Sequence, residues 1–410
     1  MKKFFPLVCC VILVFSLFTA CKESEEYNAV TTLENISDYD YSRLKGENIT
    51  LNVANWGEYM SVNDDEVLDV NKAFEELTGI EVNYKTVPTN EELYAKLQGG
   101  ADYDVIIPSD YMISRLAKEN MLQKLDYDNI PNFQYINSRF VNPDYDSANE
   151  YSVPYMWGLV CIVYNTSMIE EEIDSWDALW DEKYKDKILM PNNPRDAFGI
   201  ALLKNGYSLN TENADELNKA LESLKEQKPL LQAYVMDEIY EKMEGGSAAI
   251  GSYYVGDVIV MCEENEDLAY VLPKEGTNSF VDAMCIPTAA KNKEAAEMYI
   301  NFLCETEIAL ANCEYIGYST PHTEAYELLD EETKNNHAQY PDAEYLDNKT
   351  EGFQNLSDET NKLYDSLWNE LKIDEKSFTK WVVPVVLILS ISAVIIINII
   401  RSKKRKKNSL

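Results

Sequence analysis

The sequence predicts an α/β protein in which strands and helices alternate and build two lobes. Residues 49–108 contain three apolar strand segments separated by two helical segments, and residues 159–272 contain four further apolar strand segments. A β-α-β-α-β order is typical of a parallel, doubly wound sheet. The body between the two chain ends has roughly 325 residues, which is more than one hydrophobic core usually organises, so two lobes are expected.

The first half of the body contains the β-α-β-α-β segment. Strands are predicted at 49–53, 80–86 and 103–108. A helix over 65–78 ends at Gly79, because glycine readily adopts the left-handed conformation that closes a helix. A second helix over 90–98 ends at a Gly-Gly pair.

The second half repeats this alternation with its own segments. Its apolar strands are predicted at 159–164, 188–190, 248–252 and 269–272. Helices are predicted at 196–205, 212–227, 235–244, 295–304, 305–313 and 358–371.

The start of the chain has the pattern of a secretory signal. Residues 1–20 carry two lysines, then an apolar run, then small residues before Cys21. The residues before Cys21 resemble a bacterial lipobox, in which Cys21 would be lipidated and become the new N-terminus. Residues 21–46 are polar and acidic and are expected to form a tether.

The end of the chain predicts a membrane span. Residues 381–400 contain no charged side chain and are rich in Val, Ile and Leu, and residues 401–410 are basic. Twenty apolar residues span a bilayer core, and a basic cluster belongs on the cytoplasmic side. The body is therefore expected on the outer face of the cell membrane, extracellular or periplasmic, held by lipid, by this helix, or by both.

The charge of the body excludes a nucleic-acid partner. The two ends hold eight of the 36 Lys and Arg, so 28 remain within residues 21–400 against all 71 Asp and Glu, a formal balance of −43. Such a surface repels nucleic acid and concentrates cations.

The cysteines and histidines indicate neither a disulfide framework nor a metal site. Beyond the signal and Cys21, five cysteines remain without a pairing pattern, and they are expected to be small buried thiols. There are two histidines and no Cys-x-x-Cys or His-x-x-x-His spacing. Neither a metal nor a cofactor is expected.

Aromatic residues next to carboxylates recur along the body. Residues 55–59 place Trp56 and Tyr59 around Glu58, directly after a predicted strand. Phe280 and Asp282 are two residues apart, which on a strand puts both on one face. Carboxylates and aromatic rings both attract organic cations, so this pattern indicates a site for such a ligand.

The body resembles one family over its whole length, from about residue 49 to residue 371. The motifs are ANWGEY at 54–59, NEELYAKL at 90–97, YDVIIPSDY at 103–111, YSVPYMWG at 151–158, PKEG at 273–276, GYSTP at 317–321 and YPDAE at 340–344. In this order they are similar to the spermidine/putrescine-binding proteins that feed bacterial ABC importers, which belong to the periplasmic-binding-protein superfamily.

The resemblance implies a type II periplasmic-binding-protein fold with a ligand cleft between two lobes. Lobe one would comprise 47–158 and 280–324, and lobe two 159–279 and 325–372. The implied ligand-binding residues are Trp56, Glu58, Tyr59, Ser109, Tyr111, Asp196, Tyr254, Phe280, Asp282, Tyr318 and Gln354. Asn193 and Gly57 depart from the family pattern, which leaves the choice between a diamine and a triamine open.

The resulting hypothesis is a monomeric, non-catalytic receptor that captures spermidine or putrescine and presents it to an ABC permease. Two alternatives remain. One is a receptor for another organic cation or an amino-acid-like solute. The other is a surface carbohydrate-active enzyme that would use Glu58 or Asp196, although the sequence contains no nucleophile elbow, Ser-x-x-Lys, metal-ligand helix or phosphate loop.

Overall fold

The computed structural model describes residue 33 and residues 36–62 and 67–373. The strands are β1 (Thr50–Asn55), β2 (Glu81–Thr86), β3 (Val105–Ile106), β4 (Ser152–Asn165), β5 (Ile188–Pro191), β6 (Leu231–Val235), β7 (Ile250–Tyr254), β8 (Leu268–Val271), β9 (Thr277–Cys285) and β10 (Thr350–Gly352). Several short 3-10 helices lie between α4 and β4. The α-helices are α2 (Val70–Thr78), α3 (Asn90–Gln98), α4 (Asp110–Lys118), α5 (Pro194–Lys204), α6 (Ala214–Gln227), α7 (Glu238–Glu244), α8 (Val255–Glu264), α9 (Lys293–Leu303), α10 (Thr306–Ile316), α11 (Thr323–Leu328), α12 (Glu331–Lys334), α13 (Ala343–Lys349) and α14 (Asp358–Lys372).

The strands of the described region form one sheet in the order β2-β1-β3-β9-β4-β7-β5-β6, with β8 beside β4 and β10 beside β9. The predicted parallel pairing is confirmed for β1 with β2 and β3, and β5 is likewise parallel to β6 and β7. A wholly parallel sheet is wrong, however. The central strands β4 and β9 are antiparallel to each other, β9 is also antiparallel to its neighbour β3, and β4 is also antiparallel to its neighbour β7.

Strand β4 is longer than the sequence predicts. The prediction covered 159–164, whereas β4 begins at Ser152 and nearly all of it is buried. Its first half contains Pro154 and Gly158, which are uncommon inside strands. The register against β9 shifts between Pro154 and Met156, and this irregularity accommodates the proline.

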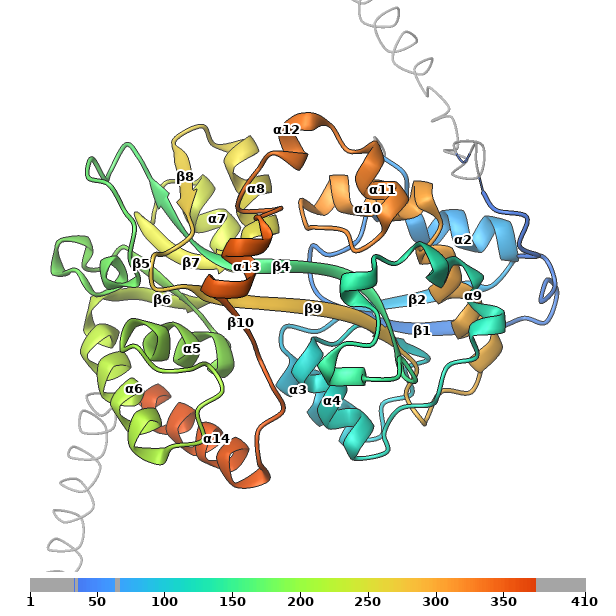
Figure 1. The fold of residues 1–410 in the computed structure, drawn as a ribbon, viewed down its shortest axis with the longest axis horizontal. Helices are drawn as coiled ribbons and strands as arrows, with labels where there is room; N and C mark the ends of the chain where they lie inside the picture. The colour runs from blue at the N-terminus through green and yellow to red at the C-terminus, as the bar shows by residue number, and fades with distance from the viewer. Residues whose placement is uncertain (1–32, 34–35, 63–66, 374–410) are drawn as a thin grey trace, which may run out of the picture.

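Helices cover both faces of both halves of the sheet, and β4 and β9 run through the middle (Figure 1). Helices α2, α9 and α10 pack on one face of the β1–β3 half, around Phe74 and Tyr299. Helices α3 and α4 cover its other face. In the second half, α5, α6 and α14 pack around Phe198, and α7 and α8 pack around Val258.

The last part of the expected tether, within 21–46, belongs to the folded body. Tyr41 is buried against the first half of the sheet, and its hydroxyl donates to Glu305 Oε1 at 2.5 Å. Leu44 is buried in the same core. Aromatic and apolar side chains at 36–44 explain this packing, because burying them removes apolar surface from water.

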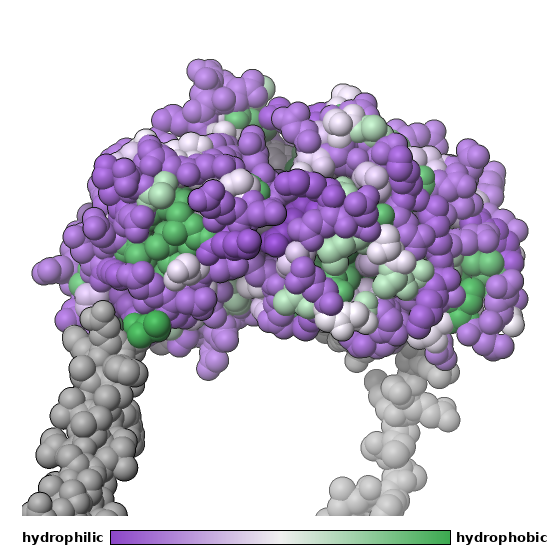
Figure 2. All heavy atoms as spheres, turned by 90° about the horizontal axis from the view of Figure 1, so that it is seen from below, coloured by the Kyte–Doolittle hydropathy of each residue, from purple (hydrophilic) through white to green (hydrophobic). Residues whose placement is uncertain are grey.

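The face of the described region that Figure 2 shows is largely hydrophilic, with separate smaller apolar patches. None of the helices within these residues is both long and apolar enough to cross a bilayer. The signal at 1–20, the lipidation site at Cys21, the span at 381–400 and the tail at 401–410 lie outside the described residues.

Candidate ligand-binding site

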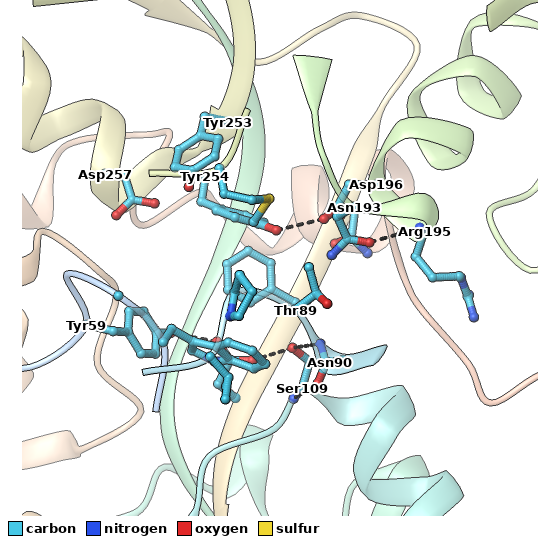
Figure 3. A pocket seen from close by; sticks show the side chains of 18 of the residues that line it. Tyr59, Thr89, Asn90, Ser109, Asn193, Arg195, Asp196, Tyr253, Tyr254 and Asp257 are labelled. Carbon is cyan, nitrogen blue, oxygen red and sulfur yellow. Dashed lines mark hydrogen bonds between the residues drawn. The ribbon is translucent and has the colours of Figure 1, made fainter. Parts of the chain in front are cut away.

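A cavity lies between the two halves of the molecule, and its empty space, including the part open to solvent, is about 700 Å³ (Figure 3). Its walls come from the ends of strands and the first turns of the helices that follow them, in both halves. The lining residues are Trp56, Gly57, Tyr59, Val87, Pro88, Thr89, Asn90, Ser109, Tyr111, Asn193, Arg195, Asp196, Met236, Asp237, Tyr253, Tyr254, Asp257, Asn278, Phe280, Asp282, Tyr318 and Phe353.

The first buried carboxylate of the cavity belongs to Asp282 on β9. Tyr59 donates its hydroxyl to Asp282 Oδ2 at 2.7 Å, and Ser109 donates its hydroxyl to Oδ1 at 2.6 Å. Asn90, the first residue of α3, holds Ser109 in place through two hydrogen bonds. Its Nδ2 donates to Ser109 Oγ at 3.0 Å, and its Oδ1 accepts from the backbone N–H of Ser109 at 3.1 Å. Asp282 therefore has a defined orientation before any ligand enters.

The second buried carboxylate belongs to Asp196 in the first turn of α5. Tyr254 donates its hydroxyl to Asp196 Oδ2 at 2.7 Å. Asn193 caps this helix by accepting from the N–H of Arg195, and Pro194 starts it. Asn193, one of the two departures from the family pattern, thus serves as a helix cap that also lines the cavity.

The third buried carboxylate belongs to Asp257 in the first turn of α8. It accepts hydroxyl hydrogen bonds from Tyr318 and Tyr240, each at 2.8 Å. Gly256 allows this arrangement, because a Cβ at that position would lie 2.0 Å from the Tyr318 ring. The ring can reach Asp257 only across a residue without a side chain.

Aromatic rings connect the three carboxylates. The ring of Tyr59 meets that of Tyr318 edge to face at 4.5 Å between centroids. Phe280 lies 5.4 Å from Tyr254 and 6.2 Å from Tyr318. The prediction that Phe280 and Asp282 share one face of a strand is confirmed, since both line the cavity. The electronegative faces of such rings favour cations.

The three carboxylates are buried without a positively charged partner. Asp196, Asp257 and Asp282 are 6%, 5% and 4% exposed. Burial raises the pKa of Asp196 and of Asp257 to about 7 and that of Asp282 to about 6, although the hydroxyl donors oppose this rise. Among the described lysines, arginines and histidines, none forms an ion pair with these carboxylates.

Arg195 is the one cationic side chain in the lining of this cavity. Its guanidinium stacks over the rings of Phe353 at 4.4 Å and Tyr111 at 4.9 Å, and it donates to the carbonyl oxygen of Gln354 at 3.2 Å. Its charge lowers the pKa of Asp196, but by less than burial raises it. Arg195 is therefore held by these rings and this carbonyl, and it does not neutralise the buried carboxylates.

Nine of the eleven predicted site residues line the cavity: Trp56, Tyr59, Ser109, Tyr111, Asp196, Tyr254, Phe280, Asp282 and Tyr318. Glu58 and Gln354 are not among the lining residues. Glu58 has a φ of 44° and is exposed, although it stands between Trp56 and Tyr59 in the sequence. Gln354 is exposed, and the neighbouring Phe353 points inward in its place.

Several lining residues were not among the predicted site residues. Asp257 had a usable signal, because it follows Tyr254 and Gly256 at the start of a helix. Asn90 begins the family-like motif at 90–97 but was not singled out, and Asp237 had no signal, since isolated polar residues at the start of a helix are common caps. Only the fold brings these helix ends to one cavity.

The described region contains five cysteines, none of them in a disulfide. Cys161, Cys262, Cys285, Cys304 and Cys313 are free thiols; all are buried except Cys262, which is half-buried. Within the described residues, no group of three or more His, Cys, Asp or Glu side chains is arranged to hold a metal ion.

Comparison with known proteins identifies the family. The sequence pattern of the bacterial extracellular solute-binding proteins matches residues 70–341, more than half of the chain. This chain belongs to the bacterial extracellular solute-binding proteins.

Individual members of the solute-binding family share most of the chain. The spermidine/putrescine-binding periplasmic protein of Salmonella typhimurium is 36% identical over 329 residues, 80% of this chain and 92% of that protein. The protein of the same name from Escherichia coli K12 is 35% identical over the same shares. The crystal structure of the spermidine/putrescine ABC transporter substrate-binding protein PotD from Streptococcus pneumoniae has a TM-score of 0.66 at 39% identity, covering 79% of this chain and 98% of that one. The predicted family resemblance and α/β binding-protein fold are confirmed.

Proposed function

We propose that this protein is an extracellular receptor that captures a linear polyamine, spermidine or putrescine, and delivers it to an ABC permease. One observation carries the proposal: three buried carboxylates, held by hydroxyl donors and without an ion-pair partner among the described residues, face an aromatic-lined cavity. The names of the related proteins support the same ligand class and transport role.

The chemistry of the cavity fits both parts of a polyamine, its ammonium groups and its methylene chain. A desolvated ammonium must regain hydrogen bonds and a counter-charge. Otherwise the free-energy penalty of removing it from water exceeds the electrostatic attraction within the site. Asp196, Asp257 and Asp282 supply the counter-charges. The rings of Tyr59, Phe280 and their neighbours cover the methylenes and offer electronegative faces to the ammonium groups.

The proposed mechanism is closure of two lobes around the ligand. Lobe one comprises 47–158 and 280–324, and lobe two 159–279 and 325–372, with β4 and β9 as connections. Asp282 and Tyr59 come from lobe one, and Asp196 and Asp257 from lobe two. A ligand that holds carboxylates of both lobes prefers the closed state, and a permease can recognise that state.

Membrane attachment is part of the proposal. Lipidation of Cys21, the apolar segment at 381–400 and the basic tail at 401–410 would hold the receptor, as a monomer, at the outer face of the membrane. The test compares membrane retention of the Cys21→Ala chain with that of a chain ending before Trp381. A chain with both changes should leave the membrane. If that doubly altered chain stays on the membrane as well as the unaltered protein does, neither segment is an anchor.

The competing hypothesis is a surface carbohydrate-active enzyme that would use Glu58 or Asp196. Glu58 is exposed and outside the cavity lining, whereas Asp196 lines the cavity and accepts a hydrogen bond from Tyr254, so turnover of a glycoside by this protein would be needed to support an enzyme. A receptor for a different organic cation would keep the same cavity. Such a receptor would bind polyamines weakly, and substitution of Asp282 by Asn would leave that weak binding unchanged.

Isothermal titration calorimetry of the full-length protein tests the proposal directly. We expect saturable binding of at least one of putrescine, cadaverine, spermidine and spermine, and weaker binding after Asp282→Asn. Absence of heat with all four amines, in a protein that melts cooperatively, would contradict a polyamine receptor.

A further inference from the structure

Gly57 and Asp237 meet at the cavity from opposite halves of the molecule. Gly57 follows β1, and Asp237 precedes α7. A Cβ on Gly57 would lie 2.2 Å from Asp237 Oδ2 and 3.1 Å from its Cγ, inside the space that the carboxylate occupies. The missing side chain at position 57 therefore leaves room for the Asp237 carboxylate.

The Asp237 carboxylate is not explained by a structural role. It stands at the N-cap position of α7, yet its side chain makes no capping hydrogen bond. Its hydrogen-bond donor is the hydroxyl of Tyr253, at 3.2 Å from Oδ1, and Tyr253 also lines the cavity. None of the described lysines and arginines forms an ion pair with it.

Asp237 differs from the other three cavity carboxylates in exposure. Asp196, Asp257 and Asp282 are each at most 6% exposed, whereas Asp237 is an exposed residue that lines the same cavity. It therefore lies at the mouth. Partial burial and the nearby Glu238 raise its pKa, which indicates that a positive charge there would be stabilising.

The charges of the cavity lining set the charge of the ligand that balances them. The ionisable residues of the lining other than tyrosine are four aspartates, at 196, 237, 257 and 282, and one arginine at 195. When ionised they leave three negative charges. A diamine leaves one of these uncompensated, whereas a linear triamine with three ammonium groups neutralises the cavity.

We propose that Asp237 binds the third ammonium group of a linear triamine at the mouth of the cavity. Gly57 makes this possible because it has no side chain, so the Asp237 carboxylate can occupy the space beside it. This inference rests on the proposed polyamine receptor and adds to it a residue that distinguishes triamines from diamines. The diamine is held by the three buried carboxylates and does not reach the mouth.

The decisive experiment measures the affinities of the full-length protein for spermidine and putrescine by calorimetry. Asp237→Asn keeps the shape of the side chain and removes its charge. We expect it to weaken spermidine binding about tenfold and putrescine binding less than about twofold, as loss of one charge-assisted hydrogen bond predicts. Glu241→Gln is the matched control, since it removes an exposed charge from the same helix outside the cavity.

A second pair of variants distinguishes the effect of the Asp237 charge from the effect of its steric contact with residue 57. Gly57→Ala forces the Asp237 carboxylate out of its position and should weaken spermidine binding to a similar extent. The double variant Gly57→Ala with Asp237→Gly removes the collision. We expect its spermidine binding to stay as weak as that of Asp237→Asn. Recovery of spermidine binding in the double variant would overturn the role of Asp237 as a cation ligand.

The outcomes keep the two proposals apart. If the unaltered protein binds both amines and Asp237→Asn weakens them equally or not at all, the inference fails and the polyamine receptor stands. If Glu241→Gln has the same effect as Asp237→Asn, the effect is long-range electrostatics and the inference again fails. If the unaltered protein binds no amine, both proposals are overturned.

Discussion

Tyr59 donates its hydroxyl to Asp282 Oδ2 at 2.7 Å, although 223 residues separate the two in the sequence. Tyr59 follows β1 and Asp282 lies within β9, so this bond joins two distant segments that line the same cavity. Burial raises the pKa of Tyr59 well above its ordinary value, so the hydroxyl keeps its proton and remains a donor. The carboxylate is thereby oriented while it retains free lone pairs for a cation.

The first prediction concerns the charge of Asp282. Asp282→Asn preserves the shape of the side chain but removes the negative charge that an ammonium group would contact. We expect polyamine affinity to fall by about two orders of magnitude, as for a buried charged partner. Titration calorimetry measures the change. Asp102→Asn, an exposed site that pairs with Lys291, is the control and should bind normally.

The second prediction concerns the pH dependence of binding. The pKa values of Asp196 and Asp257 are raised to about 7 and that of Asp282 to about 6, so these groups hold protons in the unliganded protein at mildly acidic pH. A polyammonium ligand requires them ionised. Affinity should therefore increase as pH rises from 5.5 to 8, with proton release on binding near pH 6.5. A flat profile in calorimetry over this range would contradict the assignment.

The third prediction concerns stability without ligand. Asp257 has a folded-state pKa of about 7, above the ordinary value of 3.8. Its contribution to stability is therefore fully present below pH 3.8 and is lost as pH rises towards 7. Asp257→Asn should raise the melting temperature by a few degrees at pH 8 and have little effect at pH 4.5. Equal shifts at both pH values would show that ionisation of Asp257 is not involved.

The fourth prediction compares two neighbouring residues. Trp56 lines the cavity, whereas Glu58 faces solvent. Trp56→Ala removes an aromatic face and should weaken polyamine binding about tenfold. Glu58→Gln should change the affinity less than about twofold. The same calorimetric titration measures both, and a larger effect from Glu58→Gln would restore the original expectation for that residue.

Much of the fold followed from local pattern. The predicted helix at 90–98 coincides with α3, and the helix predicted to end before Gly79 does so, with Gly79 at a φ of 72°. These signals are local, because caps and glycine conformations act within a few residues. Antiparallel pairing of β4 and β9 could not be predicted in this way, since pairing depends on partners more than 100 residues apart.

Some residues of the candidate site could likewise be predicted from local sequence, and others could not. Phe280 and Asp282 could be placed together because the strand repeat of two residues puts them on one face. Glu58 lies in an equally suggestive local sequence, but in the folded protein it is exposed and outside the cavity lining. Asp237 carries no local signal, and it lies beside Gly57 only because the two halves of the chain meet at one cavity.

By itself, the sequence determined the alternation of strands and helices, the acidic character of the body, the family, and the pairing of rings with carboxylates. The tertiary structure alone decided which acidic side chains share the cavity and which face water. The physical reason is that periodicity and composition report short-range preferences and average burial, whereas a binding site depends on distances between segments that only the packed core fixes.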